Sequence, residues 1–222
     1  MIAFLAVAGP LSAQEYVALP NQVEPEVFYR AVACAAPPGG ACSKPFLRWP
    51  AEQRRPLSVG FGTLSPALHA YQLRLYERGL AQAIAEINAL EADIWLELDP
   101  SAPQIAINVV DAKPGQTLEN TDLPLFEGAE MSLGLVAVRA NVRGQIKEAS
   151  IAISATAGRQ AIASVILEEL VQSLGLITDI RSSAPAYRRS VFSEDSNSGT
   201  RLDGQDAAAI LMHYPPREGS SQ

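Results

Sequence analysis

The chain has 222 residues, of which 48% are hydrophobic and 18% are charged. This composition is sufficient for one well-cored domain and excludes wholesale disorder. The formal net charge is −7 without a long basic run, which excludes a dedicated nucleic-acid surface. Two His in the whole chain are too few to build a His-rich metal site within one subunit.

Residues 1–13 (MIAFLAVAGPLSA) are apolar and end in small residues, a pattern typical of a secretory signal peptide cut between Ala13 and Gln14. The run lacks a basic start and is too short to span a bilayer. The alternative interpretation is an N-terminal strand or buried anchor. We therefore expect a periplasmic or secreted protein with no membrane span.

Residues 14–44 are rich in Pro and predict an irregular N-terminal arm. Cys34 and Cys42 in this arm bracket the turn-rich segment AAPPGGA, which favours bringing the two thiols together. In an oxidising compartment they would form a disulfide. The alternatives are two free thiols, if the protein is cytosolic, or half of a metal site.

The rest of the chain alternates strand and helix patterns within one domain, residues 45–217, followed by a short tail, residues 218–222. The hydrophobic periodicity predicts these elements in chain order: strands at 44–49 and 57–61, a long helix from Ser65 to about Leu90, strands at 94–98 and 104–110, a loop at 111–128, a hairpin of strands 133–141 and 145–155, and helices at 158–174 and 202–214. The order predicts an α+β fold, in which a mixed twisted sheet carries a long backing helix, an active-site-type helix and a C-terminal helix.

The segment 167–179 (LEELVQSLGLITD) resembles the active-site helix of zinc proteases of the metzincin type, H-E-x-x-H-x-x-G-x-x-H. Aligned with that motif, the three His positions are held by Glu168, Gln172 and Thr178. Glu169 falls on the general-base position and Gly175 on the turn, with Asp179 directly after the motif. The resemblance implies a degenerate zincin-like scaffold without its zinc ligands.

Two later segments extend the resemblance. Ser190-Val191-Phe192 stands where metzincins place their Met-containing turn, and residues 201–206 (RLDGQD) match the start of their last helix. The combination E-E-x-x-Q-x-L-G-L-x-x-D, S-V-F and L-D-x-x-D is similar to the secreted bacterial family labelled domain of unknown function 2927. That resemblance implies a fold and a compartment but no reaction.

The motif helix poses an electrostatic problem. Glu168, Glu169 and Gln172 share one stripe of a helix that is otherwise apolar and therefore buried. Buried carboxylates need partners or become protonated. We consider three answers: an arginine of the chain, an oxygen-ligated metal, or a solvated groove with no bound ion. The first would use Arg181, Arg188 or Arg189. The second would use Glu168, Glu169, Gln172 and Asp179 to hold Ca²⁺, Mg²⁺ or Mn²⁺, since these ligands suit zinc poorly.

Two functions are consistent with these residues. The leading hypothesis is an exported, non-catalytic zincin-fold protein that holds no cofactor and uses its cleft to bind a peptide or an envelope protein. An edge strand, either 133–138 or 146–153, would pair with the ligand's backbone. The alternative is a metal-dependent hydrolase in which Glu169 activates water on an oxygen-ligated metal.

Overall fold

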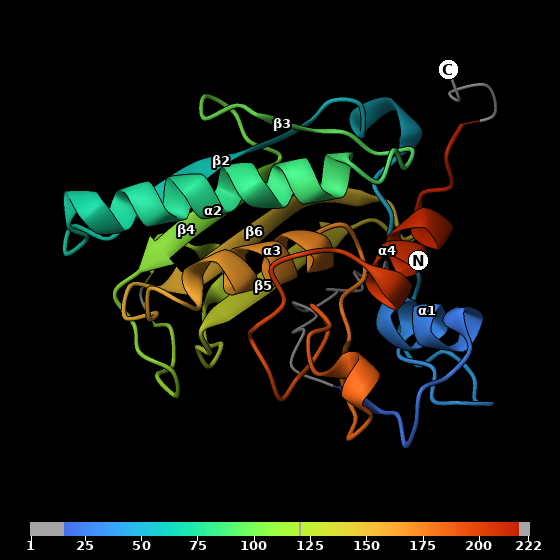
Figure 1. The fold of residues 1–222 in the computed structure, drawn as a ribbon. Helices are drawn as coiled ribbons and strands as arrows, with labels where there is room; N and C mark the ends of the chain where they lie inside the picture. Colours follow the sequence, from blue (N-terminus) through green and yellow to red (C-terminus); the bar gives the residue numbers. More distant parts are fainter. Residues whose placement is uncertain (1–15, 120, 218–222) are drawn as a thin grey trace, which may run out of the picture.

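A computed structural model of the protein describes residues 16–119 and 121–217 (Figure 1). The predicted signal peptide and the tail at 218–222 lie outside the described residues. The fold is α+β, as predicted, and is built around a mixed five-stranded sheet. In the part of the chain that is described, no helix is both long and apolar enough to cross a membrane.

The sheet has the strand order β3-β2-β4-β6-β5. Its strands are β2 (Leu57–Leu64), β3 (Leu96–Leu98), β4 (Ile105–Val110), β5 (Gly134–Ala140) and β6 (Ile146–Ser154). The first four in the sheet order are mutually parallel, whereas β5 runs antiparallel to β6. Because β6 lies between β4 and β5, only the first of the two predicted edge strands, 133–138, lies at an edge. The prediction for 146–153 was wrong.

Alternate side chains of β5 and β6 enter two different cores, as the twofold period of a strand requires. Val136 and Ile151 belong to the main core under α2 (Ala70–Asn88) and α3 (Ile162–Gln172). Leu135 and Ala152 face a smaller core formed with Ala112, Leu118, Phe126 and Met131, of which Phe126 belongs to the 3-10 turn η2 (Pro124–Phe126). Figure 1 shows α2 and α3 lying side by side along one face of the sheet, so the sheet is covered on both faces beside β5.

A second layer joins the two ends of the described chain. Helix α1 (Pro25–Cys34) packs against α4 (Gly204–His213), and β1 (Tyr16–Ala18) pairs in parallel with β7 (Asp179–Arg181). The expectation of an irregular arm at 14–44 was therefore wrong, because α1 buries Phe28, Ala31 and Val32 completely. The expectation treated Pro25 as part of an irregular segment. A Pro at the first helical position starts a helix rather than breaking one.

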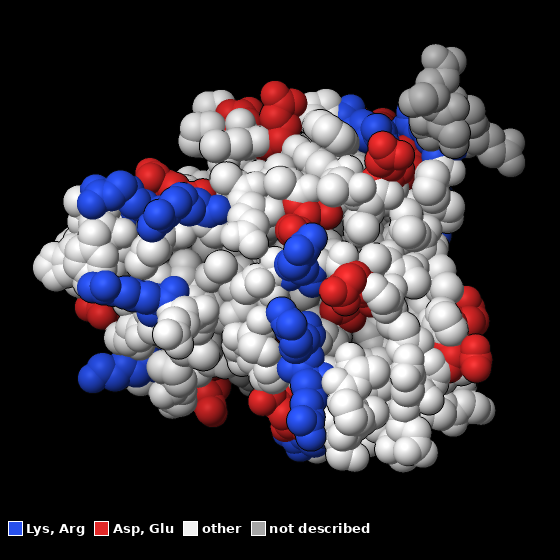
Figure 2. All heavy atoms as spheres, viewed as in Figure 1, with Lys and Arg blue, Asp and Glu red and all other residues white. Residues whose placement is uncertain are grey.

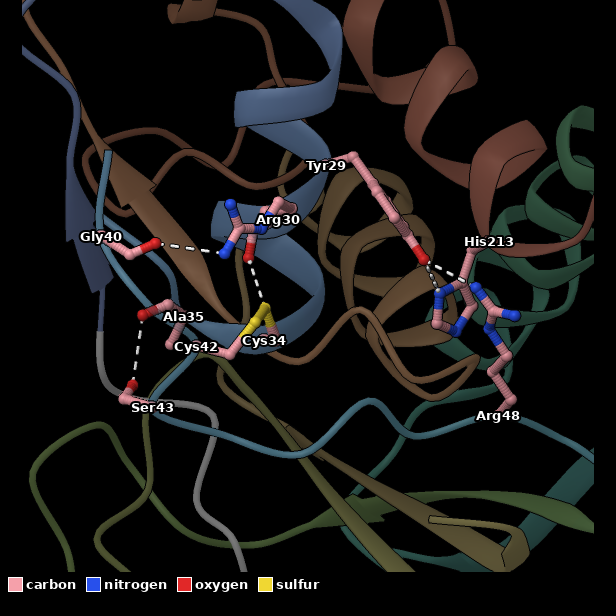
Figure 3. Close-up of a disulfide and its surroundings, with 9 residues drawn as sticks. All are labelled: Tyr29, Arg30, Cys34, Ala35, Gly40, Cys42, Ser43, Arg48 and His213. Carbon is pink, nitrogen blue, oxygen red and sulfur yellow. Dashed lines mark hydrogen bonds between the residues drawn. A yellow bond between two sulfur atoms is a disulfide. The ribbon is translucent and has the colours of Figure 1, made fainter. Parts of the chain in front are cut away.

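The predicted disulfide between Cys34 and Cys42 is confirmed (Figure 3). It closes the turn after α1, where Ser43 donates a hydrogen bond to the Ala35 carbonyl at 3.1 Å. Arg30 also donates to the Gly40 carbonyl at 3.1 Å. Side-chain bonds and the disulfide thus add to the backbone bonds of this turn, such as those from the Ser43 and Lys44 N–H groups to the Cys34 carbonyl.

Two further element boundaries differ from the prediction. Residues 44–49 form no strand and contribute a single bridge between Arg48 and Gln145, while the 3-10 turn η1 (Ala51–Gln53) follows them. Helix α2 begins after His69 and not at Ser65, because the Gln72 side chain accepts a hydrogen bond from the His69 N–H at 3.0 Å. The Ser65 hydroxyl instead accepts from the Ala67 N–H, so it caps a turn that precedes the helix.

Candidate functional site

The polar stripe of α3 faces a cavity of about 420 Å³ beside the start of β5. The wall formed by α3 supplies Glu168, Glu169 and Gln172, and the opposite walls come from β5, β7 and the segments at 114 and 194–197. The complete lining is Pro114, Ser132, Leu133, Gly134, Leu135, Glu168, Glu169, Gln172, Asp179, Glu194 and Asn197. Four of these described residues are acidic and none is basic, so the cavity presents acceptor oxygens.

Glu169 is the most enclosed of the carboxylates, with 5% of its surface exposed. Its Oε2 atom is buried and has no hydrogen-bond partner. The side chain lies directly against Gly134, where an added Cβ would be 2.7 Å from Glu169 Cγ and 2.6 Å from Val165 Cγ1. Burial, followed by the charge of Asp179, raises the Glu169 pKa well above its ordinary range. The surroundings of Glu169 therefore provide neither enough hydrogen-bond donors nor a positive charge to stabilise its ionised carboxylate.

Glu168 lies nearer the opening. It accepts a hydrogen bond from Asn197 Nδ2 at 3.2 Å. Burial is the main cause that raises its pKa, and repulsion from Glu169, Asp179 and Glu194 acts in the same direction. The two glutamates of the motif therefore disfavour each other's ionisation.

Asp179 closes the far wall and accepts a hydrogen bond from Gln172 Nε2 at 2.7 Å. Burial and the nearby Glu194 raise its pKa to about 8, although the Gln172 bond and the charge of Lys44 act in the opposite direction. Gln172 is turned so that its NH₂ group serves Asp179. Its predicted role as a metal position would therefore require the amide to turn around.

The three arginines predicted as fillers of the former metal position do not line the cavity. Arg181 reaches only its rim, where it pairs with Glu194 at 3.5 Å and Asp195 at 3.2 Å and lies 3.8 Å from the centre of the Tyr16 ring. Arg188 and Arg189 are exposed. In Figure 2, basic side chains form a column over the segment that follows α3, while acidic atoms appear there only in small groups. No arginine therefore lines the cavity among the described residues.

Gly175, the predicted turn residue, lies in the turn after α3, whereas Thr178, predicted at a former metal position, lies outside the cavity lining. Gly175 has φ of 107°, and an added Cβ would meet the Leu47 carbonyl oxygen and, at 3.1 Å, His213 Nε2. Only glycine fits such a conformation at such a close approach. Thr178 is fully buried and does not line the cavity, and its N–H donates to the Val32 carbonyl. Asp179, one residue later, faces the cavity in its place.

Ser190 and Phe192, in the predicted former Met-turn, also lie outside the cavity lining. The Ser190 hydroxyl donates to Asp206 Oδ1 at 2.7 Å, and the Val191 N–H donates to Asp206 Oδ2 at 2.8 Å. Phe192 is fully buried and meets Phe28 of α1 edge-on at 5.8 Å between ring centres. This turn therefore fastens α4 to α1 and has a structural role.

Seven residues that line the cavity were not predicted as site residues: Pro114, Ser132, Leu133, Gly134, Leu135, Glu194 and Asn197. Glu194 and Asn197 belong to a run interpreted as a solvated loop, and Gly134 was taken as part of a strand only. The signal for Glu194 was an acidic residue two positions after Phe192, the last residue of the S-V-F turn. Nothing in the sequence indicated that Asn197 would reach Glu168, because the chain returns to α3 only through the fold.

The model of one protein family, described as protein of unknown function (DUF2927), matches residues 29–218. The chain belongs to this family. The matched region contains both cysteines and every described residue that lines the cavity. A comparison with curated proteins finds no match.

The chemistry available in the cavity is that of a cation acceptor. Among residues 16–119 and 121–217, no three His, Cys, Asp or Glu side chains are arranged to hold a metal ion. What the site offers is a set of partly dehydrated carboxyl groups, of which Glu169 keeps an unpartnered oxygen. Buried carboxylates in such a state favour the arrival of positive charge.

Proposed function

We propose that the protein is an exported, non-catalytic protein with a degenerate zincin-like fold, and that it binds an extended peptide or an extended segment of an envelope protein along β5. The observation that carries this proposal is the acidic cavity beside the start of the sheet's last strand. Peptide ligands commonly add a strand to the edge of a sheet by backbone pairing, while pockets receive alternate side chains.

The register of the hairpin defines which backbone groups of β5 would receive the ligand. The N–H of Ser154, the last residue of β6, donates to the carbonyl of Leu133, the residue before β5. Leu133 and Ser154 therefore form a hydrogen-bonded pair of the ladder. In an antiparallel ladder such pairs alternate with pairs whose backbone groups point away. Gly134, Val136 and Val138 are therefore the residues whose N–H and C=O groups face away from β6. No strand within the described residues pairs with these outward-facing groups, and the Gly134 carbonyl among them accepts a hydrogen bond from the Ser132 hydroxyl.

The relation to zincins rests on analogy of fold and motif. Its support is the combination of a mostly parallel sheet, an antiparallel edge strand, and a buried helix with Glu169 beside that strand. The replacement of every metal-binding His supports a binding role without catalysis.

Export is supported by the disulfide, since such bonds persist in oxidising compartments. We expect the mature protein to begin at Gln14 and to contain no free thiol. Intact-mass measurement of protein purified from its native host, with and without a thiol-alkylating reagent, checks both points. An intact residue 1–13 segment together with two alkylated thiols would contradict the proposal.

The peptide-binding proposal is tested with a strand-forming probe, Ac-Thr-Val-Lys-Val-Thr-NH₂, added to isotope-labelled mature protein. We expect the amide resonances of Gly134, Val136 and Val138 to shift more than those of Leu135 and Ala137. Two N-methylated forms of the same peptide provide the control, because each removes the N–H donors on one edge of the peptide only. One form should lose binding and the other should keep it. Loss in both forms, or shifts remote from β5, would contradict strand addition.

The alternative is a hydrolase with an oxygen-ligated metal and Glu169 as the general base. Its support is that Glu169 lines the cavity. The same structure turns the Gln172 amide toward Asp179 and provides no converged set of metal ligands among the described residues. This alternative therefore requires rearrangement of the site. It predicts peptide hydrolysis that needs a divalent cation and is abolished by Glu169→Gln.

A further inference from the structure

We infer that the acidic cavity receives a positively charged side chain, lysine or arginine, from the bound peptide. This inference rests on the proposed function, because it names the residue type that the peptide must carry at one position. It assigns the carboxyl groups of α3 to ligand recognition. It also explains why the cavity is lined by acidic residues and by no basic one.

The first support is the unsatisfied oxygen of Glu169. The atom is buried, has no hydrogen-bond partner, and belongs to a side chain that is 5% exposed. Native proteins seldom leave such a group unpaired, because the lost hydration is not compensated. An ammonium or guanidinium group carries several donors and a positive charge, so it would supply both missing interactions at once.

The second support is the direction in which a ligand side chain would point. A Cβ added to Gly134 would point at Glu169. Residues directly opposite each other on neighbouring strands project their side chains from the same face of the sheet. A peptide residue paired with Gly134 would therefore direct its side chain toward Glu169. Because Gly134 has no side chain, that path is unobstructed by the protein residue beside it.

The third support is the shape and polarity of the space. The cavity measures about 420 Å³ and has Leu133 and Pro114 in its wall, together with the carboxyl groups of Glu168, Glu169 and Asp179. A long aliphatic stem that ends in a charge matches an apolar wall leading to carboxylates. An acidic side chain would be repelled by every charged lining residue. A neutral one would leave Glu169 Oε2 without a charged partner.

The test compares peptides Ac-Thr-Val-Xaa-Val-Thr-NH₂ in which Xaa is Lys, Arg, norleucine or Glu. Affinity is measured by calorimetry at low salt with a chelator present. We expect the Lys and Arg peptides to bind about tenfold more tightly or better than the norleucine peptide, the size of one charge-assisted hydrogen bond. Glu169→Gln should remove most of this advantage without weakening the norleucine peptide. Glu77→Gln, an exposed change on α2, is the matched control and should have no effect.

The outcomes separate this inference from the proposed function. Equal binding of all four peptides would overturn the cationic subsite and leave strand addition intact, while preference for the Glu peptide would overturn the subsite outright. Binding of none of the peptides would remove the proposed function itself. Without chelator, stoichiometric binding of Ca²⁺ or Mg²⁺ that displaces the Lys peptide would assign the cavity to a metal ion and overturn the inference.

Discussion

Two buried carboxyl groups in this protein have raised pKa values but very different surroundings. Asp206 on α4 accepts bonds from the Ser190 hydroxyl at 2.7 Å and the Val191 N–H at 2.8 Å, and burial raises its pKa to about 6. Glu169 on α3 is equally buried but keeps an oxygen with no partner. The difference indicates that Asp206 stabilises the fold through its hydrogen bonds, whereas the buried carboxyl group of Glu169 does not stabilise the fold in this way.

The largest expected effect belongs to the structural member of this pair. Asp206→Ala leaves the Ser190 hydroxyl and the Val191 N–H without an acceptor in the interior, so the free energy of unfolding should fall by about 3 kcal/mol. Denaturant unfolding at neutral pH measures it. Asp203→Ala, an exposed change just before the same helix, should cost no more than about 0.5 kcal/mol. Equal losses in the two variants would refute the structural role of Asp206.

A smaller effect concerns the pH dependence caused by the cavity. Burial raises the Asp179 pKa from 3.8 to about 8, so the folded protein keeps a proton that the unfolded chain has already lost. The contribution of this group to the free energy of unfolding is therefore fully present below pH 4 and is lost as the pH rises to about 8. Asp179→Asn keeps an acceptor for Gln172 and removes the titration.

Between pH 4 and pH 9 the wild type should lose stability relative to the Asp179→Asn variant, because only the wild type carries the titrating carboxyl group. The loss belongs to the coupled group, which includes Glu168, Glu169, Glu194 and the nearby Lys44. His213, whose pKa burial lowers to about 3, weakens both proteins alike below pH 6.5 and cancels in the difference. If the free energies of unfolding of the two proteins change with pH in parallel, the Asp179 pKa is not raised in the folded protein.

The smallest effect tests the contact between β5 and Glu169. In Gly134→Ala the new methyl group would overlap Glu169 and Val165, which should lower the free energy of unfolding by about 1–2 kcal/mol and weaken the Lys peptide. Gly158→Ala is the matched control, because a Cβ there meets open space. If Gly134→Ala binds the Lys peptide as well as the wild type does, the peptide side chain does not enter beside this residue.

The sequence predicted the elements around the cavity better than the cavity itself. The periods of α3 and of the β5–β6 hairpin are strong local signals, and Gly175 marks a turn that only glycine fits. Helix α1 was missed because its Pro content suggested an irregular segment, while its burial depends on α4 at the other end of the chain.

The cavity required information that no local pattern contains. Thr178 and Asp179 differ by one position, and the pairing of β7 with β1 fixes the backbone of Asp179, the residue that lines the cavity. Glu194 and Asn197 reach the motif helix through an irregular segment, so their positions follow from tertiary packing. The expectation of an arginine in the cavity was reasonable electrostatically. Arg181 instead pairs with Glu194 and Asp195 at the rim.

The most direct measurement is a carbon-detected NMR titration of the side-chain carboxyl groups of Asp179 and Glu169, without and with a saturating amount of the Lys peptide. We expect a pKa of about 8 for Asp179 in the free protein, a Glu169 pKa above its ordinary range, and a fall in both pKa values when the cationic side chain binds. Ordinary pKa values in the free protein, or raised values that the Lys peptide leaves unchanged, would contradict the claim that this cavity is reserved for a positively charged ligand group.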